Sequence, residues 1–146
     1  MTTILLADDH PMIRTAIEVL LRDTDFEIVG TAGTGDEAFM LLAQTQPEIL
    51  LLDLQMPGGT GMEVIRRLEE AQEAPPIVVL TAAVDDSSLM EARALGVRGM
   101  VLKNSDPAYL LECLERVRGG GSWLDPELSA RIQGVTESLG DKRRPA

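Results

Sequence analysis

Side chains capable of chemistry stand at the ends of four short aliphatic runs in this sequence. In chain order they are Asp8 with Asp9, then Asp53, Thr81 and Lys103. An unbroken aliphatic run bounded by polar or Pro/Gly-rich segments indicates a strand buried on both faces of a parallel sheet. Because ligand sites in such sheets lie at the carboxyl ends of the strands, we expect these side chains to converge on one site.

The combination of three carboxylates with a hydroxyl and an ammonium favours metal-assisted phosphoryl transfer. Neighbouring carboxylates repel each other unless a cation joins them, and oxygen ligands at an open strand end suit Mg²⁺, or Mn²⁺ in its place. Asp53 or a neighbouring carboxylate could then accept a phosphoryl group as an aspartyl phosphate. The metal and Lys103 would neutralise the phosphoryl oxygens, and the Thr81 hydroxyl would donate a hydrogen bond to one of them.

Each of these residues also has a simpler structural interpretation. Asp8 and Asp9 could cap a helix, Lys103 could be a solvated charge, and Thr81 could be a hydroxyl at a strand end. Their joint occurrence at four strand ends makes the wholly structural interpretation the weaker one. His10 is the only histidine, and a lone histidine lacks the partners of a zinc site. We therefore expect it neither to bind a metal nor to transfer phosphate.

The elements that must position this site alternate along the chain. Strands are expected at residues 3–7, 26–32, 49–52, 75–81 and 99–102, and helices at 11–21, 35–46, 60–70, 85–95 and 107–118. Five strand–helix repeats predict an α/β fold with a doubly wound, five-stranded parallel sheet in the order 2-1-3-4-5. The helix over 85–95 has the smallest apolar set, so we expect it to be mobile.

Composition restricts the class of protein. The 146 residues suffice for one folded domain, and without a membrane-length apolar run or a signal peptide the chain is expected to be cytoplasmic. The formal net charge of −11 argues against nucleic-acid binding by this segment, because phosphate neutralisation needs clustered Lys and Arg. The single cysteine, Cys113, excludes a disulfide framework and is expected to be a buried, inert thiol.

Four segments of the sequence carry a specific likeness to a known family. They are Asp8-Asp9-His10-Pro11, Asp53-Leu54-Gln55-Met56-Pro57-Gly58, Thr81-Ala82 and Leu102-Lys103. In combination they closely resemble the receiver domain of two-component response regulators, in particular the NarL/FixJ type, and the resemblance covers about residues 2–118.

The resemblance implies a function for the chain and a role for each site residue. Asp53 would be phosphorylated by a sensor histidine kinase or a small phosphodonor. Mg²⁺ would be held by Asp8, Asp9, Asp53 and the backbone carbonyl of Gln55, while the phosphoryl group would be bound and sensed by Thr81, Ala82 and Lys103. The domain would catalyse only its own phosphorylation and slow dephosphorylation, and it would form a homodimer when phosphorylated.

One position departs from the family pattern. Receiver domains usually carry a Tyr or Phe in the fifth strand that rotates inward with the switch threonine, and the matching residue here is Met100. A flexible thioether can fill the space in several rotamers, but it cannot give the aromatic in/out signal in the same way.

Four other functions compete with this interpretation. Gly33-Thr34-Gly35-Asp36-Glu37-Ala38 matches a dinucleotide fingerprint, but it follows the second strand and places two acidic residues where pyrophosphate would lie, and a flavodoxin-like FMN site is disfavoured similarly. A haloacid dehalogenase-type hydrolase would have a second aspartate where this chain has Gln55. A phosphorylation-independent interaction module would be expected to have lost a site residue, and none is missing.

Residues 119–146 are expected to form a Gly-rich linker, a short helix and a polar tail. Asp125 and Pro126 predict a helix start, and a narrow apolar stripe follows at Leu128, Ile132, Val135 and Leu139. The helix could pack on its own domain, fray as a linker, or contact a dimer partner or another domain. The resemblance implies a helix-turn-helix domain further along the parent protein, so we expect truncation before it, with transcription controlled through DNA contacts of that absent domain.

Overall fold

The computed structural model describes residues 1–57, 60–72 and 74–143, with side chains as far as residue 134. A parallel sheet forms its centre, in the order β2-β1-β3-β4-β5-β6. The strands are β1 (Thr2–Ala7), β2 (Phe26–Ala32), β3 (Ile49–Leu52), β4 (Ile77–Thr81), β5 (Gly99–Leu102) and β6 (Trp123–Leu124). The predicted order of the first five strands is therefore confirmed.

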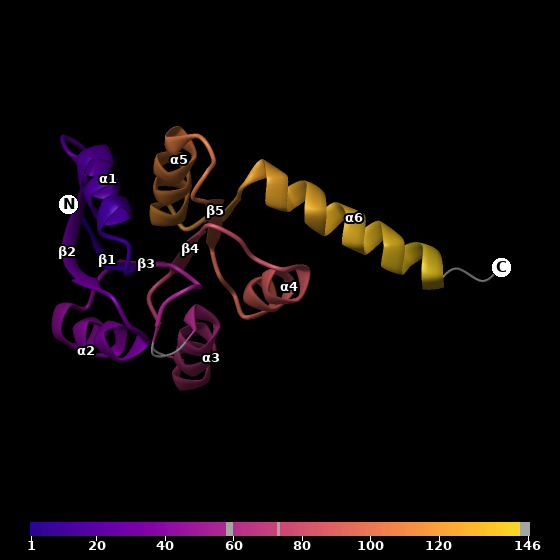
Figure 1. The fold of residues 1–146 in the computed structure, drawn as a ribbon, viewed down its shortest axis with the longest axis horizontal. Helices are drawn as coiled ribbons and strands as arrows, with labels where there is room; N and C mark the ends of the chain where they lie inside the picture. The colour runs from indigo at the N-terminus through magenta and orange to yellow at the C-terminus, as the bar shows by residue number, and fades with distance from the viewer. Residues whose placement is uncertain (58–59, 73, 144–146) are drawn as a thin grey trace.

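Helices cover both faces of this sheet (Figure 1). The helices are α1 (Pro11–Leu21), α2 (Gly35–Thr45), α3 (Gly61–Ala71), α4 (Asp86–Ala94), α5 (Pro107–Arg118) and α6 (Pro126–Arg143). In Figure 1, α1 and α5 lie on one face and α2, α3 and α4 on the other, while α6 extends away from the sheet. None of the helices in the described part of the chain is long and apolar enough to cross a membrane.

The strand β3 shows why its four aliphatic residues form a fully buried strand. Ile49 and Leu51 belong to the core beneath α1 and α5, whereas Leu50 and Leu52 belong to the core beneath α2, α3 and α4. Side chains alternate between the faces of a strand, so a sheet covered on both sides needs apolar residues at every position. The residue after this run is Asp53, a polar side chain that is itself buried.

The structure adds a two-residue strand, β6, to the five strands expected from the sequence. Trp123 and Leu124 pair in parallel with Gly99 and Met100 of β5, and the Trp123 ring packs against Tyr109 of α5 with centroids 5.4 Å apart. The sheet therefore has six strands and not the five that were expected. The sixth could not be predicted because a strand of two residues is too short to show an alternating pattern.

The start of α6 packs on the domain as well. Leu128 is fully buried and belongs to the core that α4 helps to form. The predicted helix start is confirmed, since Asp125 Oδ1 accepts a hydrogen bond from the backbone N–H of Glu127. The side chains of Val135 and Leu139, Gly58 and residues 144–146 of the expected tail lie outside the described residues.

Cys113 is confirmed as a buried thiol on α5. Burial raises the pKa of this thiol to about 12, so it is uncharged at neutral pH and has little nucleophilic thiolate.

Candidate functional site

The candidate site lies at the carboxyl edge of the sheet. At the ends of three strands, the hydrogen bonding between neighbouring strands continues for one more residue. The backbone N–H of Asp8 donates to the Ala32 carbonyl, that of Asp53 to Ala7, and that of Lys103 to Thr81, all at 2.8–2.9 Å. These bonds fix the backbone of each residue just as its side chain leaves the core. Asp8, Asp53 and Thr81 are each 1% exposed, whereas Ala82 and the side chain of Gln55 are exposed.

Lys103 joins the two buried carboxylates. Its Nζ lies 2.8 Å from Asp8 Oδ2 and 2.9 Å from Asp53 Oδ2. Burial by itself lowers the pKa of Lys103, but the contacts with Asp8 and Asp53 raise it by more, so the pKa lies above its ordinary value of 10.5. The ammonium therefore stays charged at neutral pH and can neutralise further negative charge brought to Asp53.

Asp53 is oriented through both of its carboxylate oxygens. Oδ1 accepts a hydrogen bond from the backbone N–H of Gln55 at 3.1 Å, while Oδ2 accepts one from Lys103 at 2.9 Å. The Gln55 side chain is exposed. A nucleophilic carboxylate held in one orientation by two donors is suited to attack on an incoming electrophile.

Two buried carboxylate oxygens test whether a cation fits here. Asp8 Oδ2 and Asp9 Oδ1 accept no hydrogen bond within the described part of the chain, although the Lys103 ammonium faces the former as an ion pair. Leaving a buried acceptor without a partner costs about 1–3 kcal/mol. Donor atoms of Asp8, Asp9, His10 and Asp53 all lie within 4.8 Å of one another. The residues therefore fit a small divalent cation such as Mg²⁺.

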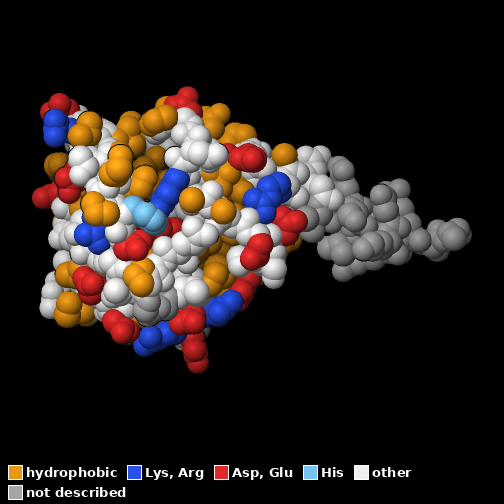
Figure 2. Space-filling view, viewed as in Figure 1, with side chains coloured by type: hydrophobic (Ala, Val, Ile, Leu, Met, Phe, Trp, Pro, Cys, Tyr) orange, Lys and Arg blue, Asp and Glu red, His pale blue; other side chains and the backbone are white. Residues whose placement is uncertain are grey.

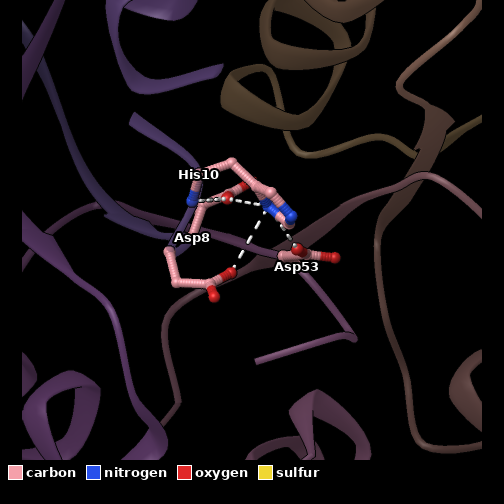
Figure 3. Close-up of side chains that lie close together, drawn as sticks. Asp8, His10 and Asp53 are labelled. Carbon is pink, nitrogen blue, oxygen red and sulfur yellow. Dashed lines mark hydrogen bonds and ion pairs between the residues drawn. The ribbon is translucent and has the colours of Figure 1, made fainter. Parts of the chain in front are cut away.

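His10 belongs to this cluster (Figure 3), although a lone histidine was not expected from the sequence to bind a metal. Its Nδ1 lies 2.8 Å from Asp8 Oδ1, 3.3 Å from Asp9 Oδ1 and 3.5 Å from Asp53 Oδ2. Figure 2 shows the chain's one histidine on the surface of this face, with acidic and basic side chains beside it. The sequence signal that could have found it is its position immediately after the acidic pair.

Thr81 and Met100 are both buried. The Thr81 hydroxyl donates to the Ala83 carbonyl at 3.1 Å, within the loop that leads to α4. Ala82 is exposed in the same loop. Met100 pairs with Val79 of β4 on one side and with Leu124 of β6 on the other.

Two polar residues of the α6 region contact the loops of the site and were not singled out as site residues from the sequence. Asp125 is 1% exposed, and its Oδ2 accepts hydrogen bonds from the Leu102 backbone N–H at 3.1 Å and from Ser105 Oγ at 2.5 Å. Arg131 Nη2 donates to the Val84 carbonyl at 2.6 Å and to Asp86 Oδ1 at 2.7 Å. Both thereby connect α6 to segments that border Lys103 and Thr81.

The chain and its fold have counterparts among known proteins. A family model described as the response regulator receiver domain matches residues 4–115. The nitrate/nitrite response regulator protein NarL of Escherichia coli strain K12 is 35% identical over 136 residues, which make up 90% of this chain and 63% of NarL. The chain spans 60 to 68% of the length of several curated relatives that it matches.

Solved structures of response regulators also match this chain. The structure of a LuxR-family two-component response regulator from Aurantimonas sp. SI85-9A1 matches with a TM-score of 0.85 at 30% identity, covering 93% of this chain and 99% of that one. RcsB from Salmonella enterica serovar Typhimurium, bound to a promoter in the presence of the phosphomimetic BeF3-, matches with a TM-score of 0.86 at 26% identity, covering 99% and 72%. The chain belongs to the response regulator receiver domain family, and its relatives are two-component regulators of the NarL and LuxR type.

Proposed function

We propose that Asp53 accepts a phosphoryl group from a sensor histidine kinase, or from a small phosphodonor, in a reaction that requires Mg²⁺. The phosphorylated domain then changes the surfaces that it offers to a second copy or to a neighbouring domain. The observation that carries the proposal is the position of Asp53, a buried carboxylate with one oxygen on the Gln55 backbone N–H and the other on the Lys103 ammonium.

The transfer is a displacement at phosphorus. A carboxylate oxygen of Asp53 forms the new P–O bond, and the bond from phosphorus to the donor breaks with its electron pair leaving on the donor atom. Asp8, Asp9, Asp53 and the Gln55 carbonyl would hold the cation, which supplies positive charge to the phosphoryl oxygens when bound. Lys103 supplies a second positive charge from the chain itself, because its ammonium lies within hydrogen-bonding distance of Asp53 Oδ2.

The response to phosphorylation is proposed to begin at Thr81. Its hydroxyl, which now donates to Ala83, would turn to donate to a phosphoryl oxygen on Asp53, with Ala82 following through the backbone. The loop from Thr81 to α4 would then move, and the carbonyl of Val84 in that loop is a hydrogen-bond acceptor for Arg131 of α6. Movement of the loop would thereby be transmitted to α6. Met100 would accommodate the turn of Thr81 by a rotamer change in place of an aromatic ring.

Control of transcription is proposed for the whole regulator. We propose that residues 2–118 act as the receiver and residues 119–146 as the connection to a DNA-binding domain. The net charge of −11 on this segment supports a separate domain for DNA contact. The solved RcsB structure bound to a promoter, which this chain matches over 72% of its length, supports the same arrangement.

Intact-mass spectrometry tests the phosphorylation directly. The chain is incubated with acetyl phosphate and Mg²⁺, and we expect one added phosphoryl group in the wild type and none in Asp53→Asn. Release of inorganic phosphate in many turnovers from unrelated phosphoesters would instead favour a hydrolase of the haloacid dehalogenase type. An unmodified wild-type chain with bound Mg²⁺ would contradict the proposal.

A further inference from the structure

The side chain of His10 is placed as if to take part in the acidic cluster. The side chain is 53% exposed, yet its Nδ1 contacts a carboxylate oxygen of Asp8, Asp9 and Asp53 at 2.8, 3.3 and 3.5 Å. Its own backbone N–H also donates to Asp8 Oδ1 at 2.8 Å, which fixes the orientation of the residue (Figure 3). The ring nitrogen therefore lies among carboxylate oxygens, although the side chain as a whole is half exposed.

The Lys103 ammonium indicates which form of the ring this position suits. Lys103 Nζ lies 3.1 Å from His10 Nδ1, and a lysine ammonium can only donate hydrogen bonds. The contact is favourable when Nδ1 carries a lone pair and unfavourable when it carries a proton. The same nitrogen also lies 2.8 Å from Asp8 Oδ1, so it faces both an ammonium and a carboxylate oxygen. An unprotonated imidazole nitrogen is the form that binds metal.

The spacing of the donor atoms agrees with shared coordination. Ligands at adjacent corners of an octahedron with bonds of about 2.1 Å lie about 3 Å apart. The three distances from His10 Nδ1 to carboxylate oxygens, 2.8, 3.3 and 3.5 Å, lie close to that separation. A single ion could therefore contact the nitrogen and the oxygens with little rearrangement.

We propose that His10 Nδ1 is a nitrogen ligand of this metal site and makes the site prefer Mn²⁺ and other first-row transition-metal ions over Mg²⁺. The inference rests on the metal site of the proposed function and extends it to metal selectivity. Mg²⁺ favours oxygen ligands and water, whereas imidazole nitrogen is a good ligand for transition metals. Mg²⁺ would be coordinated by the carboxylates without His10, whereas Mn²⁺ would be coordinated by the carboxylates and by His10.

Calorimetric titration of the full chain with each metal alone compares the two modes. We expect His10→Ala to lower the affinity for Mn²⁺ by about tenfold, which is the size of effect that mutations around a metal site produce. The affinity for Mg²⁺ should fall by less than about twofold. Asp9→Asn serves as the matched control, because losing an oxygen ligand should weaken both metals. Equal loss of both metals in His10→Ala, or loss of neither, would overturn the proposal.

Pulsed electron paramagnetic resonance of the Mn²⁺-loaded wild type gives a second readout that does not depend on a variant folding. Electron spin echo envelope modulation should show coupling to an imidazole nitrogen, and the signal should vanish in His10→Ala. Mn²⁺ bound without nitrogen coupling would overturn the role of His10 while leaving phosphorylation of Asp53 intact. Nitrogen coupling in a chain that cannot be phosphorylated would instead contradict the proposed function alone.

Discussion

Lys103 Nζ lies 2.9 Å from Asp53 Oδ2. The ammonium that is expected to bind the phosphoryl group therefore already contacts the carboxylate that would carry this group. The same ammonium lies 2.8 Å from Asp8 Oδ2, which is also a proposed metal ligand. Lys103 thus holds positive charge where a divalent cation would bind. Metal entry and this ion pair compete for the same two carboxylates.

Replacing Lys103 should therefore strengthen metal binding and weaken phosphoryl transfer. We expect Lys103→Met to raise the affinity for Mg²⁺ by roughly tenfold, which corresponds to about 1.4 kcal/mol, because a competing cation is removed. Titration calorimetry measures the affinity, and mass spectrometry measures the slower phosphorylation. Arg93→Met removes an exposed cation of α4 and should change neither; a fall in Mg²⁺ affinity in Lys103→Met would contradict this competition.

The raised pKa of Lys103 predicts how its contribution to stability depends on pH. A group whose pKa is higher in the folded state contributes stability that is fully present below its ordinary pKa, here 10.5, and is lost as pH rises through the folded value. The difference in free energy of unfolding between wild type and Lys103→Met should be constant from neutral pH to about pH 9–10 and shrink above that. Urea unfolding followed by Trp123 fluorescence measures it. A difference that grew with alkaline pH would have the wrong sign.

Thr81→Ala should separate phosphorylation from its consequence. The variant keeps Asp53 and its two donors, so we expect nearly full phosphorylation by mass spectrometry. It lacks the hydroxyl that would follow the phosphoryl group, so its change of oligomeric state by sedimentation should be much reduced. Thr81→Ser keeps the hydroxyl and serves as the control. Dimerisation of Thr81→Ala equal to that of the wild type would show that the response does not pass through this residue.

Arg131 should hold the start of α6 to the loop after Thr81. Loss of its contacts with Val84 and Asp86 should lower the local stability by about 1 kcal/mol, which speeds amide exchange about fivefold. Hydrogen exchange of residues 126–134 and 82–86 in Arg131→Ala measures this effect. Arg66→Ala breaks a comparable exposed pair with Glu91 on α3 and α4 and should leave α6 unchanged. Unaltered exchange in Arg131→Ala would remove the proposed connection to α6.

Gly61 should be intolerant of a side chain because α3 starts against the backbone of the site. A Cβ there would lie 2.5 Å from the Asp53 carbonyl oxygen and 2.6 Å from Leu54 Cα, and neither atom can move freely. We expect Gly61→Ala to lower the free energy of unfolding by about 2–3 kcal/mol. Gly134→Ala, with no atom within 4 Å of its Cβ, should instead stabilise α6 by up to about 1 kcal/mol. Denaturant unfolding of both variants tests the contrast.

The fold was predictable where local pattern and tertiary environment agree. Ile49 to Leu52 form an unbroken aliphatic run because both faces of β3 are covered, so the run indicates both a strand and its place inside the sheet. Helix starts at Pro11 and Pro126 were predictable from the first-turn preference of proline. The strand β6 was not predictable, because its two residues depend on pairing with Gly99 and Met100 rather than on any local pattern.

The carboxylates, hydroxyl and ammonium at the strand ends could be predicted from the sequence, whereas the contacts of His10 and Arg131 could not. Parallel topology alone brings the ends of β1, β3, β4 and β5 to one edge. The position of His10 among the carboxylates depends on how the chain turns into α1, and the contacts of Arg131 join segments 45 and 47 residues apart. A residue pattern does not encode distances of that kind. Neither His10 nor Arg131 was therefore among the site residues predicted from the sequence.

We propose that Asp53 alone carries the phosphoryl group, and chemical mapping of the modified residue checks this assignment. After incubation with acetyl phosphate and Mg²⁺, borohydride reduces the acyl phosphate to an alcohol, so the phosphorylated aspartate becomes homoserine and tandem mass spectrometry locates it. We predict homoserine at position 53 and unmodified Asp8 and Asp9. Homoserine at position 8 or 9, or phosphate retained on His10 with Asp53 unmodified, would show that Asp53 is not the phosphoryl acceptor.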